Sequence, residues 1–269
     1  CQVQSMTEAS PVKWHLGHTT WFFETFVLGG HVDGYEPYHP RFAYLFNSYY
    51  NAAGDRIARP NRGMLTRPPL STVIDYRRTV DDHVARLLDD LPDDKHDEVA
   101  YLIALGLNHE QQHQELIVTD VNHLLSQNPL DAVYREAAPP PDTDPGDIAW
   151  RAHPGGEVEI GHAGDGFAYD NEGPRHPRLL QPFELASRLV TCGEYLAFMA
   201  DGGYEDPQLW LDLGWSTVQQ HGWRAPQYWR QRDGRWEQFT MAGRRPVIMS
   251  EPVCHVSYFE ADRSEEHTS

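Results

Sequence analysis

An eight-residue stretch, NHEQQHQE at residues 108–115, constrains this chain more than any other feature. It lies in the middle of a helical run that we expect from about residue 94 to residue 128, where Pro129 ends it. His109 and His113 are four residues apart and therefore lie one above the other on one helical face. Two neutral imidazoles at this spacing can chelate one metal ion. The alternative is a pair of core histidines satisfied by hydrogen bonds, and we favour the metal site.

The helix face that carries this histidine pair is apolar. At about 100° per residue, the following residues share it: Leu102, Leu105, Gly106, Leu116, Ile117 and Leu124. The two rings are therefore expected to point toward a core and not into solvent.

The first helix of the chain offers a third ligand. Ser10 followed by Pro11 is typical of a helix start, with serine as the N-cap and proline at the first position, and the helix should end before the glycine pair at residues 29–30. His18 shares an aromatic stripe that contains Trp14, Trp21, Phe22 and Phe26. His15 lies about 60° around the helix from His18, at the edge of that stripe. Either histidine can complete a three-histidine site, and each can instead be a packed core residue.

A second amphipathic helix is predicted from a Ser71 N-cap to about Asp90. Its apolar side contains Val73, Ile74, Val80, Val84, Leu87 and Leu88. Three helices with short connections, and one more ahead of Cys1, predict a four-helix up-down bundle.

The segment between the first two helices, residues 31–69, has no long periodic run but is rich in aromatic residues and arginines. Long ordered loops inside compact domains are usually functional. Arg59 and Arg62 are candidates for binding a substrate carboxylate through a bidentate guanidinium. The alternative is a surface loop that packs on the bundle through its aromatic rings.

The pattern changes after a Pro- and Asp-rich linker at residues 137–148. We therefore expect a helical domain over residues 1–136 and a second domain over residues 149–262. Its many Gly, Pro and Trp residues and short apolar runs indicate an irregular α+β fold with short strands and long loops. Cys192 and Cys254 are expected to be inert packing residues. The predicted fold class is α plus α+β.

Composition excludes several classes of function. A net charge of −18 argues against a nucleic-acid partner, because binding to phosphate depends on clustered Lys and Arg. The chain has no run of 18 apolar residues, so no membrane span is predicted. Three cysteines without CxxC spacing, and no visible secretory signal, make a reducing cytoplasm the expected location.

Several longer motifs occur in both domains. In the first domain they are WHLGH (14–18), FNSYYNAAG (46–54), RPNRGMLTRP (59–68) and NHEQQHQEL (108–116), and in the second domain PGGEVEIGH, DNEGPRHP, ADGGY and PVCHVSYFEA. Together these motifs resemble the bacterial sulfoxide synthases of ergothioneine biosynthesis. The resemblance covers the chain to residue 262. It implies a DinB-like four-helix bundle followed by an incomplete domain of the formylglycine-generating-enzyme type, which is C-type-lectin-like.

The same resemblance implies a chemistry. The family holds Fe(II) with three histidines, here His18, His109 and His113, and joins a thiol (cysteine or γ-glutamylcysteine) to hercynine with O2, giving a sulfoxide. Tyr49 and Tyr50 are similar to a tyrosine pair of the cysteine-using branch, in which a phenol near the iron acts as a proton donor. Gln112, beside a metal ligand, is similar to a residue that contacts hercynine. The oligomeric state is left open.

Three other functions compete with this interpretation. HEQQH also satisfies H-E-x-x-H, the zinc-peptidase signature, with Glu110 as general base. The longer metzincin pattern fails, because Leu116 occupies its glycine position and Thr119 its third histidine position. A DinB-type metal-dependent thiol S-transferase would lack the second domain. A binding module that has lost the chemistry is the third alternative.

Both ends of the sequence suggest a fragment. The chain lacks an initiator Met, and the stretch that follows YFEA in the family is absent. Residues 263–269 (RSEEHTS) match the translation of a sequencing adapter, so we expect the natural sequence to stop near residue 262 and the last seven residues to be an artefact.

Overall fold

The computed structural model describes residues 2–50 and 54–266, and the chain divides into two compact units. The first unit comprises Cys1–Gln127 and His162–Pro174, and the second comprises Asn128–Gly161 and Arg175–Ser269. These limits differ from the domain boundaries that we expect at residues 136 and 149. The expected boundaries stay predictions. Residues 137–148, the expected linker, contain neither helix nor strand and are almost all exposed.

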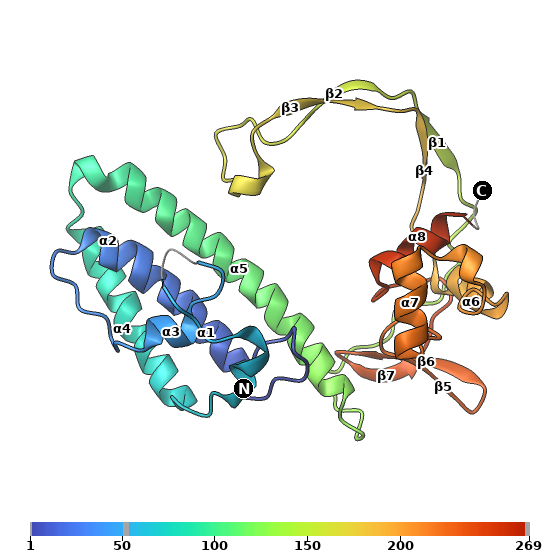
Figure 1. Ribbon diagram of the computed structural model, residues 1–269, viewed down its shortest axis with the longest axis horizontal. Coiled ribbons are helices and arrows are strands. Elements are labelled where there is room, and N and C mark those ends of the chain that lie inside the picture. Colours follow the sequence, from blue (N-terminus) through green and yellow to red (C-terminus); the bar gives the residue numbers. More distant parts are fainter. Residues whose placement is uncertain (1, 51–53, 267–269) are drawn as a thin grey trace. The chain divides into compact units, whose positions relative to one another are not determined.

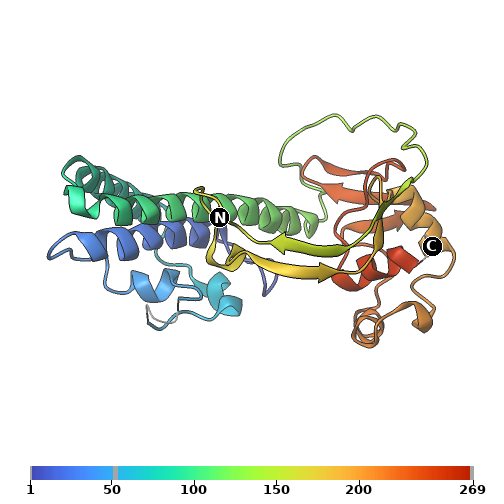
Figure 2. The same cartoon turned by 90° about the horizontal axis from the view of Figure 1, so that it is seen from above.

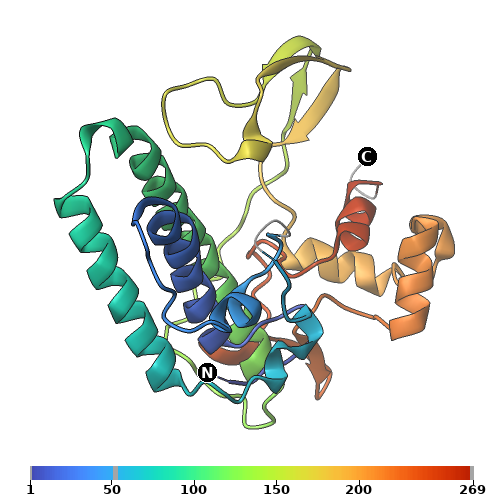
Figure 3. The same ribbon diagram turned by 60° about the vertical axis from the view of Figure 1, so that its left-hand side comes forward.

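Three long helices lie side by side in the first unit (Figures 1 and 3). They are α1 (Val12–Phe22), α4 (Leu70–Asp89) and α5 (His96–Ser126). Helix α1 packs against both of the others, and Figure 2 shows it running alongside α5. Within the described residues the unit has no fourth long helix, but the helical character predicted for this half is confirmed.

The first helix begins and ends differently from the sequence prediction. Pro11, not Ser10, is the N-cap residue, because the Ser10 N–H donates to Asp120 Oδ2 at 2.9 Å and is held outside the helix. At the other end, a π-helical segment (Phe23–Leu28) and α2 (Gly29–His31) continue the helix through the glycine pair. Burial of Val27 and Leu28 stabilises this continuation more than the glycines oppose it. Likewise α4 begins at Leu70 after a Pro69 N-cap, so the predicted Ser71 cap is wrong.

The core of this unit lies between α1, α4 and the short helix α3 (Phe42–Phe46). It consists of Trp14, Trp21, Leu28, Phe42, Phe46, Val73, Tyr76 and Val80. Gly17 lets the Phe46 ring approach α1, since a Cβ there would lie 2.3 Å from a ring carbon. Neighbouring helices cover only part of each amphipathic face, so Ile74, Leu88 and Leu116, which were expected to be inward, are exposed.

The second unit is built from short antiparallel strands (Figure 1). Two-stranded pairs join β1 (Trp150–His153) to β4 (Phe183–Ala186) and β2 (Gly156–Ile160) to β3 (His176–Leu180). The third sheet has the order β5-β6-β7, with bounds Trp229–Arg232, Arg235–Thr240 and Gly243–Pro246. The helices of the second unit are α6 (Cys192–Ala200), α7 (Asp212–His221) and α8 (Tyr258–Glu266). Short strands and long loops confirm the predicted α+β character.

An aromatic cluster around Tyr195, Tyr204 and Trp210 forms the core of the second unit. Glu260 of α8 is buried there and accepts a hydrogen bond from the Tyr204 hydroxyl. Cys192 is buried as expected, but Cys254 is exposed, because it lies in the loop before α8 and not in the cluster.

Helix α8 continues into the expected artefactual tail as far as Glu266, and residues 267–269 lie outside the described part. The origin of that tail stays a prediction. None of the described helices combines the length and apolar character that crossing a membrane requires.

Candidate metal centre

The structure brings three histidines from two helices together. His18 on α1 and His109 and His113 on α5 each offer one ring nitrogen, and these atoms all lie within 4.8 Å of one another. Their ring centroids are 4.6 to 5.0 Å apart. Of the described residues, this is the group of His, Cys, Asp and Glu side chains that is arranged to hold a metal ion.

Burial keeps these three rings uncharged. Desolvation lowers the pKa of His18 to about 3, of His109 to about 4 and of His113 to about 2. For His18 and His113 the neighbouring histidines lower the pKa further, because two positive rings would repel each other. At neutral pH each ring therefore has an unprotonated nitrogen with a lone pair for a metal ion.

The hydrogen bonds of the rings fit a three-imidazole metal site. His18 Nδ1 lies 2.5 Å from the Phe46 carbonyl oxygen and can only donate to it, which leaves Nε2 unprotonated. A bond of this kind commonly orients a metal-binding histidine. His109 Nδ1 is buried and has no hydrogen-bond partner. A buried polar atom without a partner costs free energy, and a metal ion bound at this nitrogen would account for it.

His15, the other candidate for the third ligand, has a different place. Its Nδ1 lies 2.7 Å from His113 Nδ1, and its Nε2 lies 3.0 Å from Asp120 Oδ2. Sequence reasoning did not find Asp120. The signal was present, because Asp120 follows His113 by seven residues and two helical turns return it to the same face.

Trp14 contacts both His18 and Arg62, a residue of the loop at residues 31–69. Its indole stacks on the His18 ring at a centroid distance of 4.6 Å and an interplanar angle of 13°. The guanidinium carbon of Arg62 lies 3.4 Å from the indole centroid on the same ring system. Arg62 is buried and donates to Ser10 Oγ and Ser48 Oγ at 2.9 and 3.1 Å. Burial lowers its pKa to about 10, so it remains a cation at neutral pH.

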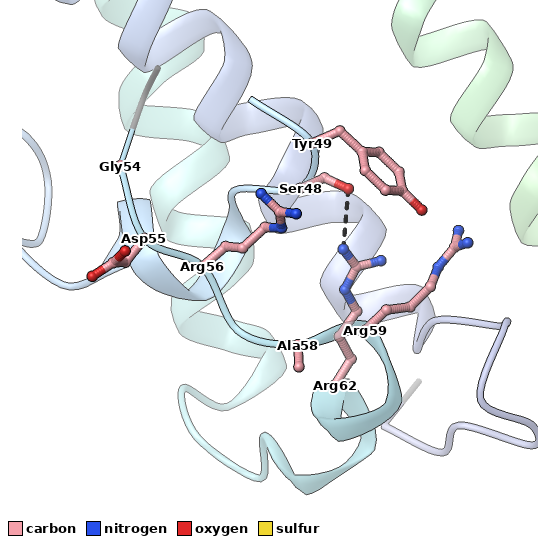
Figure 4. Close-up of a pocket in the computed structure, with 8 residues that line it drawn as sticks. All are labelled: Ser48, Tyr49, Gly54, Asp55, Arg56, Ala58, Arg59 and Arg62. Carbon is pink, nitrogen blue, oxygen red and sulfur yellow. Dashed lines mark hydrogen bonds between the residues drawn. The ribbon is translucent and has the colours of Figure 1, made fainter. Parts of the chain in front are cut away.

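A cavity of about 700 Å³ opens beside this arginine (Figure 4). Its lining consists of Ser48, Tyr49, Gly54, Asp55, Arg56, Ala58, Arg59 and Arg62. Figure 4 shows the Tyr49 ring and three guanidinium groups on the same side, with the Asp55 carboxylate directed away from them. The cavity is therefore positively charged and suits a carboxylate.

The tyrosine pair divides between two environments. Tyr49 is 68% exposed and lines the cavity, with the guanidinium carbon of Arg59 5.9 Å from its ring centroid. Tyr50 packs instead on Phe26 and Phe22, and the Phe22 ring is 5.1 Å from that of His109. Burial raises the pKa of the Tyr50 phenol. Tyr50, which is 36% exposed, thus reaches the His109 side of the site only through the Phe22 ring, whereas Tyr49 lines the cavity.

Gln112, the residue expected to contact hercynine, is exposed on α5 next to His113. No described contact of its side chain tests that role, which stays a prediction.

Glu110 is engaged in an ion pair. Arg77 Nη2 donates to both of its carboxylate oxygens, at 2.6 and 2.7 Å. A general base needs a free carboxylate oxygen directed at water beside the metal. The ion pair therefore disfavours the zinc-peptidase interpretation of HEQQH.

Two family models match the two halves of the chain. Residues 1–117 match the DinB superfamily, and residues 149–263 match the sulfatase-modifying factor enzyme 1-like domain. The chain is also 30% identical over 257 residues to a hercynine oxygenase of Mycolicibacterium smegmatis, which covers 94% of this chain and 56% of that protein. Over almost its whole length the chain is thus similar to a hercynine oxygenase.

Two other hercynine oxygenases give similar values. The protein of Mycolicibacterium thermoresistibile is 32% identical over 257 residues, and that of Mycobacterium tuberculosis is 30% identical over 255 residues. Each match covers 94% of this chain, but 54% and 57% of the respective relative. The chain thus spans little more than half the length of the curated relatives it matches.

Proposed function

We propose that His18, His109 and His113 bind Fe(II), and that the protein is a non-haem iron sulfoxide synthase of ergothioneine biosynthesis. The observation that carries the proposal is the convergence of three uncharged histidine rings in a chain that is similar to a hercynine oxygenase over 94% of its length. In the proposed reaction, RSH + hercynine + O2 gives the sulfoxide + H2O. An S–H and a C–H bond break, a C–S bond forms, and O2 takes four electrons, with one oxygen atom on sulfur and the other in water.

Fe(II) held by these three imidazoles would supply the redox chemistry that lets O2 oxidise the thiol and the substrate imidazole. The remaining roles belong to side chains of this chain. Arg59 and Arg62 would bind the carboxylate of the thiol substrate in the cavity that Tyr49 also lines. Tyr50, whose raised pKa keeps its phenol protonated, would hold a proton beside the His109 side of the site.

We propose cysteine as the sulfur donor in preference to γ-glutamylcysteine. The tyrosine pair resembles that of the cysteine-using branch, and the sequence has no obvious clamp for a γ-glutamyl group. The cavity beside Arg62 offers guanidinium groups that can bind the carboxylate of cysteine. Steady-state rates with the two thiols decide the matter, and a clear preference for the dipeptide would contradict this choice.

Two features favour a sulfoxide synthase over the competing functions. The match of residues 149–263 to a second domain disfavours a thiol S-transferase, which would have the bundle alone. The ion pair between Arg77 and Glu110 disfavours a peptidase.

The test uses purified protein loaded with Fe(II) without oxygen. Hercynine and cysteine are added with a known amount of O2, and O2 uptake and the mass of the product are followed. We expect one O2 consumed for each sulfoxide formed, and loss of both signals in His109→Ala. Copurification of zinc alone, together with peptide hydrolysis and no O2 uptake, would contradict the proposal. Metal binding without turnover, both in this chain and in a version extended to the length of its relatives, would indicate a binding module.

Tyr50→Phe tests the proton role. The phenyl ring keeps the contacts with Phe22 and Phe26 but has no proton to give, so sulfoxide formation should fall by about 10²-fold or more while the amount of bound iron stays unchanged. Tyr49→Phe is the matched control for an adjacent, exposed phenol in the cavity. An equal effect of the two substitutions would show that the distinction between the two tyrosines is wrong.

A further inference from the structure

We propose that Asp120 and His15 form a positioning pair that holds His113 in the tautomer required for metal binding. The inference rests on the proposed metal centre and goes beyond it, because neither residue belongs to the group of three histidines. The geometry is a chain of hydrogen bonds, from the Asp120 carboxylate through both nitrogens of His15 to Nδ1 of His113.

This chain is enclosed. His15 is 2% exposed and the Asp120 side chain is 13% exposed. The Ser10 N–H donates to Asp120 Oδ2 at 2.9 Å, the same oxygen that lies 3.0 Å from His15 Nε2. The carboxylate is therefore fixed from two sides, by the start of α1 and by a side chain one turn further along that helix. Packing of the His15 ring at 5.0 Å from the His113 ring leaves little freedom for either imidazole.

The order of donors follows from the carboxylate. Two Nδ1 atoms 2.7 Å apart share one proton, so one ring donates and the other accepts. An ionised carboxylate only accepts, so the proton of neutral His15 lies on Nε2, facing Asp120. His15 Nδ1 is then the acceptor, and His113 Nδ1 is the donor. A neutral His113 with its proton on Nδ1 has its lone pair on Nε2, the nitrogen that remains for the metal.

His18 shows the same arrangement with a different partner. Its Nδ1 donates to the Phe46 carbonyl, as His113 Nδ1 donates to His15. A backbone carbonyl is an invariable acceptor, whereas an imidazole is an acceptor only in one tautomer. Asp120 is needed because it imposes that tautomer on His15. Without it, His15 can carry its proton on Nδ1, which would push the proton of His113 onto the metal-binding nitrogen.

The test measures Co²⁺ affinity of the whole protein by competition with a chromophoric chelator. His15→Phe keeps a ring in the buried space but removes the acceptor, and should weaken Co²⁺ binding by about 10- to 100-fold, the usual range for partners of metal-binding histidines. His15→Asn restores an acceptor oxygen near the position of Nδ1 and should regain most of the lost affinity. The proton NMR spectrum of the Co²⁺ protein should retain a slowly exchanging His113 ring N–H in the wild type and His15→Asn, and lose it in His15→Phe.

Control variants separate the inference from the metal centre itself. His123→Phe makes the same change at a different buried histidine, which lies on α5 and forms a hydrogen bond with Ser5 Oγ. It should leave the Co²⁺ affinity within about twofold of wild type. If His15→Phe does not fold, Asp120→Leu keeps a side chain of similar size but offers no acceptor to His15 Nε2, and should still weaken binding several-fold.

Three outcomes would overturn the positioning role. The first is unchanged affinity in His15→Phe, or in Asp120→Leu where that variant stands in for it. The second is equal affinity of the Phe and Asn variants at position 15. The third is loss of a coordinating nitrogen from the Co²⁺ absorption spectrum of His15→Phe, which would make His15 a ligand. A wild-type protein that binds no Co²⁺, or whose binding survives His109→Ala, would instead contradict the proposed metal centre.

Discussion

The Arg77 guanidinium on α4 forms an ion pair with the Glu110 carboxylate on α5, in which Arg77 Nη2 donates to both carboxylate oxygens at 2.6 and 2.7 Å. Glu110 is the neighbour of His109, so the ion pair connects the segment of α5 that carries His109 to the adjacent helix α4. The two side chains are only 31% and 23% exposed, which limits screening by solvent. In this fold, the glutamate of HEQQH is a structural residue.

The first prediction concerns Glu110→Gln. Loss of the charge should lower the free energy of unfolding by about 1 kcal/mol, while the amount of bound metal and the rate of sulfoxide formation stay close to wild type. Chemical denaturation and metal analysis measure the two effects. Asp75→Asn, which breaks the exposed pair between Arg78 and Asp75, is the control and should change stability by less than about 0.5 kcal/mol. A large fall in turnover with metal retained would restore Glu110 as a candidate base.

The second prediction concerns the close approach of the Phe46 ring to α1. A Cβ at Gly17 would lie 2.3 Å from that ring, so Gly17→Ala should destabilise the protein by about 1–3 kcal/mol through overpacking. Gly30→Ala, in a helical segment with nothing within 4 Å of the added methyl, should be neutral or stabilising by up to about 1 kcal/mol. Thermal unfolding compares them. Similar melting temperatures for both variants would show that the ring moves aside at no cost.

The third prediction concerns acid unfolding. The Arg188 guanidinium, with the Thr191 N–H and hydroxyl, lowers the pKa of Glu194 to about 2 from an ordinary 4.5. Between these pH values the unfolded chain binds more protons at this group than the folded chain does. The stabilisation is therefore complete above about pH 4.5 and is lost as pH falls toward 2.

Urea unfolding at a series of pH values measures this effect. Glu194→Gln should reduce the slope of stability against pH within that window and leave the slope above pH 5 unchanged. The same slope in wild type and variant would mean that the carboxylate is solvated to the same extent in both states.

The fourth prediction concerns the two described thiols. Burial raises the pKa of the Cys192 thiol to about 12, so almost no thiolate forms there at pH 8, and the side chain is also inaccessible. Cys254 is exposed. Iodoacetamide at pH 8 should therefore modify Cys254 within minutes to hours and leave Cys192 unmodified until the protein is unfolded, as peptide mass mapping will show. Modification of Cys192 in the native state at a comparable rate would contradict its burial.

The sequence alone determined the elements whose signals are local. The four-residue spacing of His109 and His113 places both on one face of a long helix, whatever packs against it, because the geometry of the helix is periodic. The stripe around Trp14 and Trp21 indicated a buried first helix in the same way. Short apolar runs separated by Gly and Pro were sufficient to predict the α+β character of the second half. Helix ends were less predictable, since a cap contributes only about 1 kcal/mol and contacts such as that between Ser10 and Asp120 override it.

Only the tertiary structure decided which histidine completes the group of three. His15 and His18 lie about 60° apart on α1, and the residue pattern allowed either as a ligand. Packing of α1 against α5 and α3 turns His18 toward His109 and bonds its other nitrogen to Phe46, while His15 is left between His113 and Asp120. These partners are 28 to 105 residues apart in the chain, and no local pattern encodes such distances. The physical reason is that a ligand set is defined by the direction of ring nitrogens to within a hydrogen-bond length, and only close packing of side chains fixes that direction.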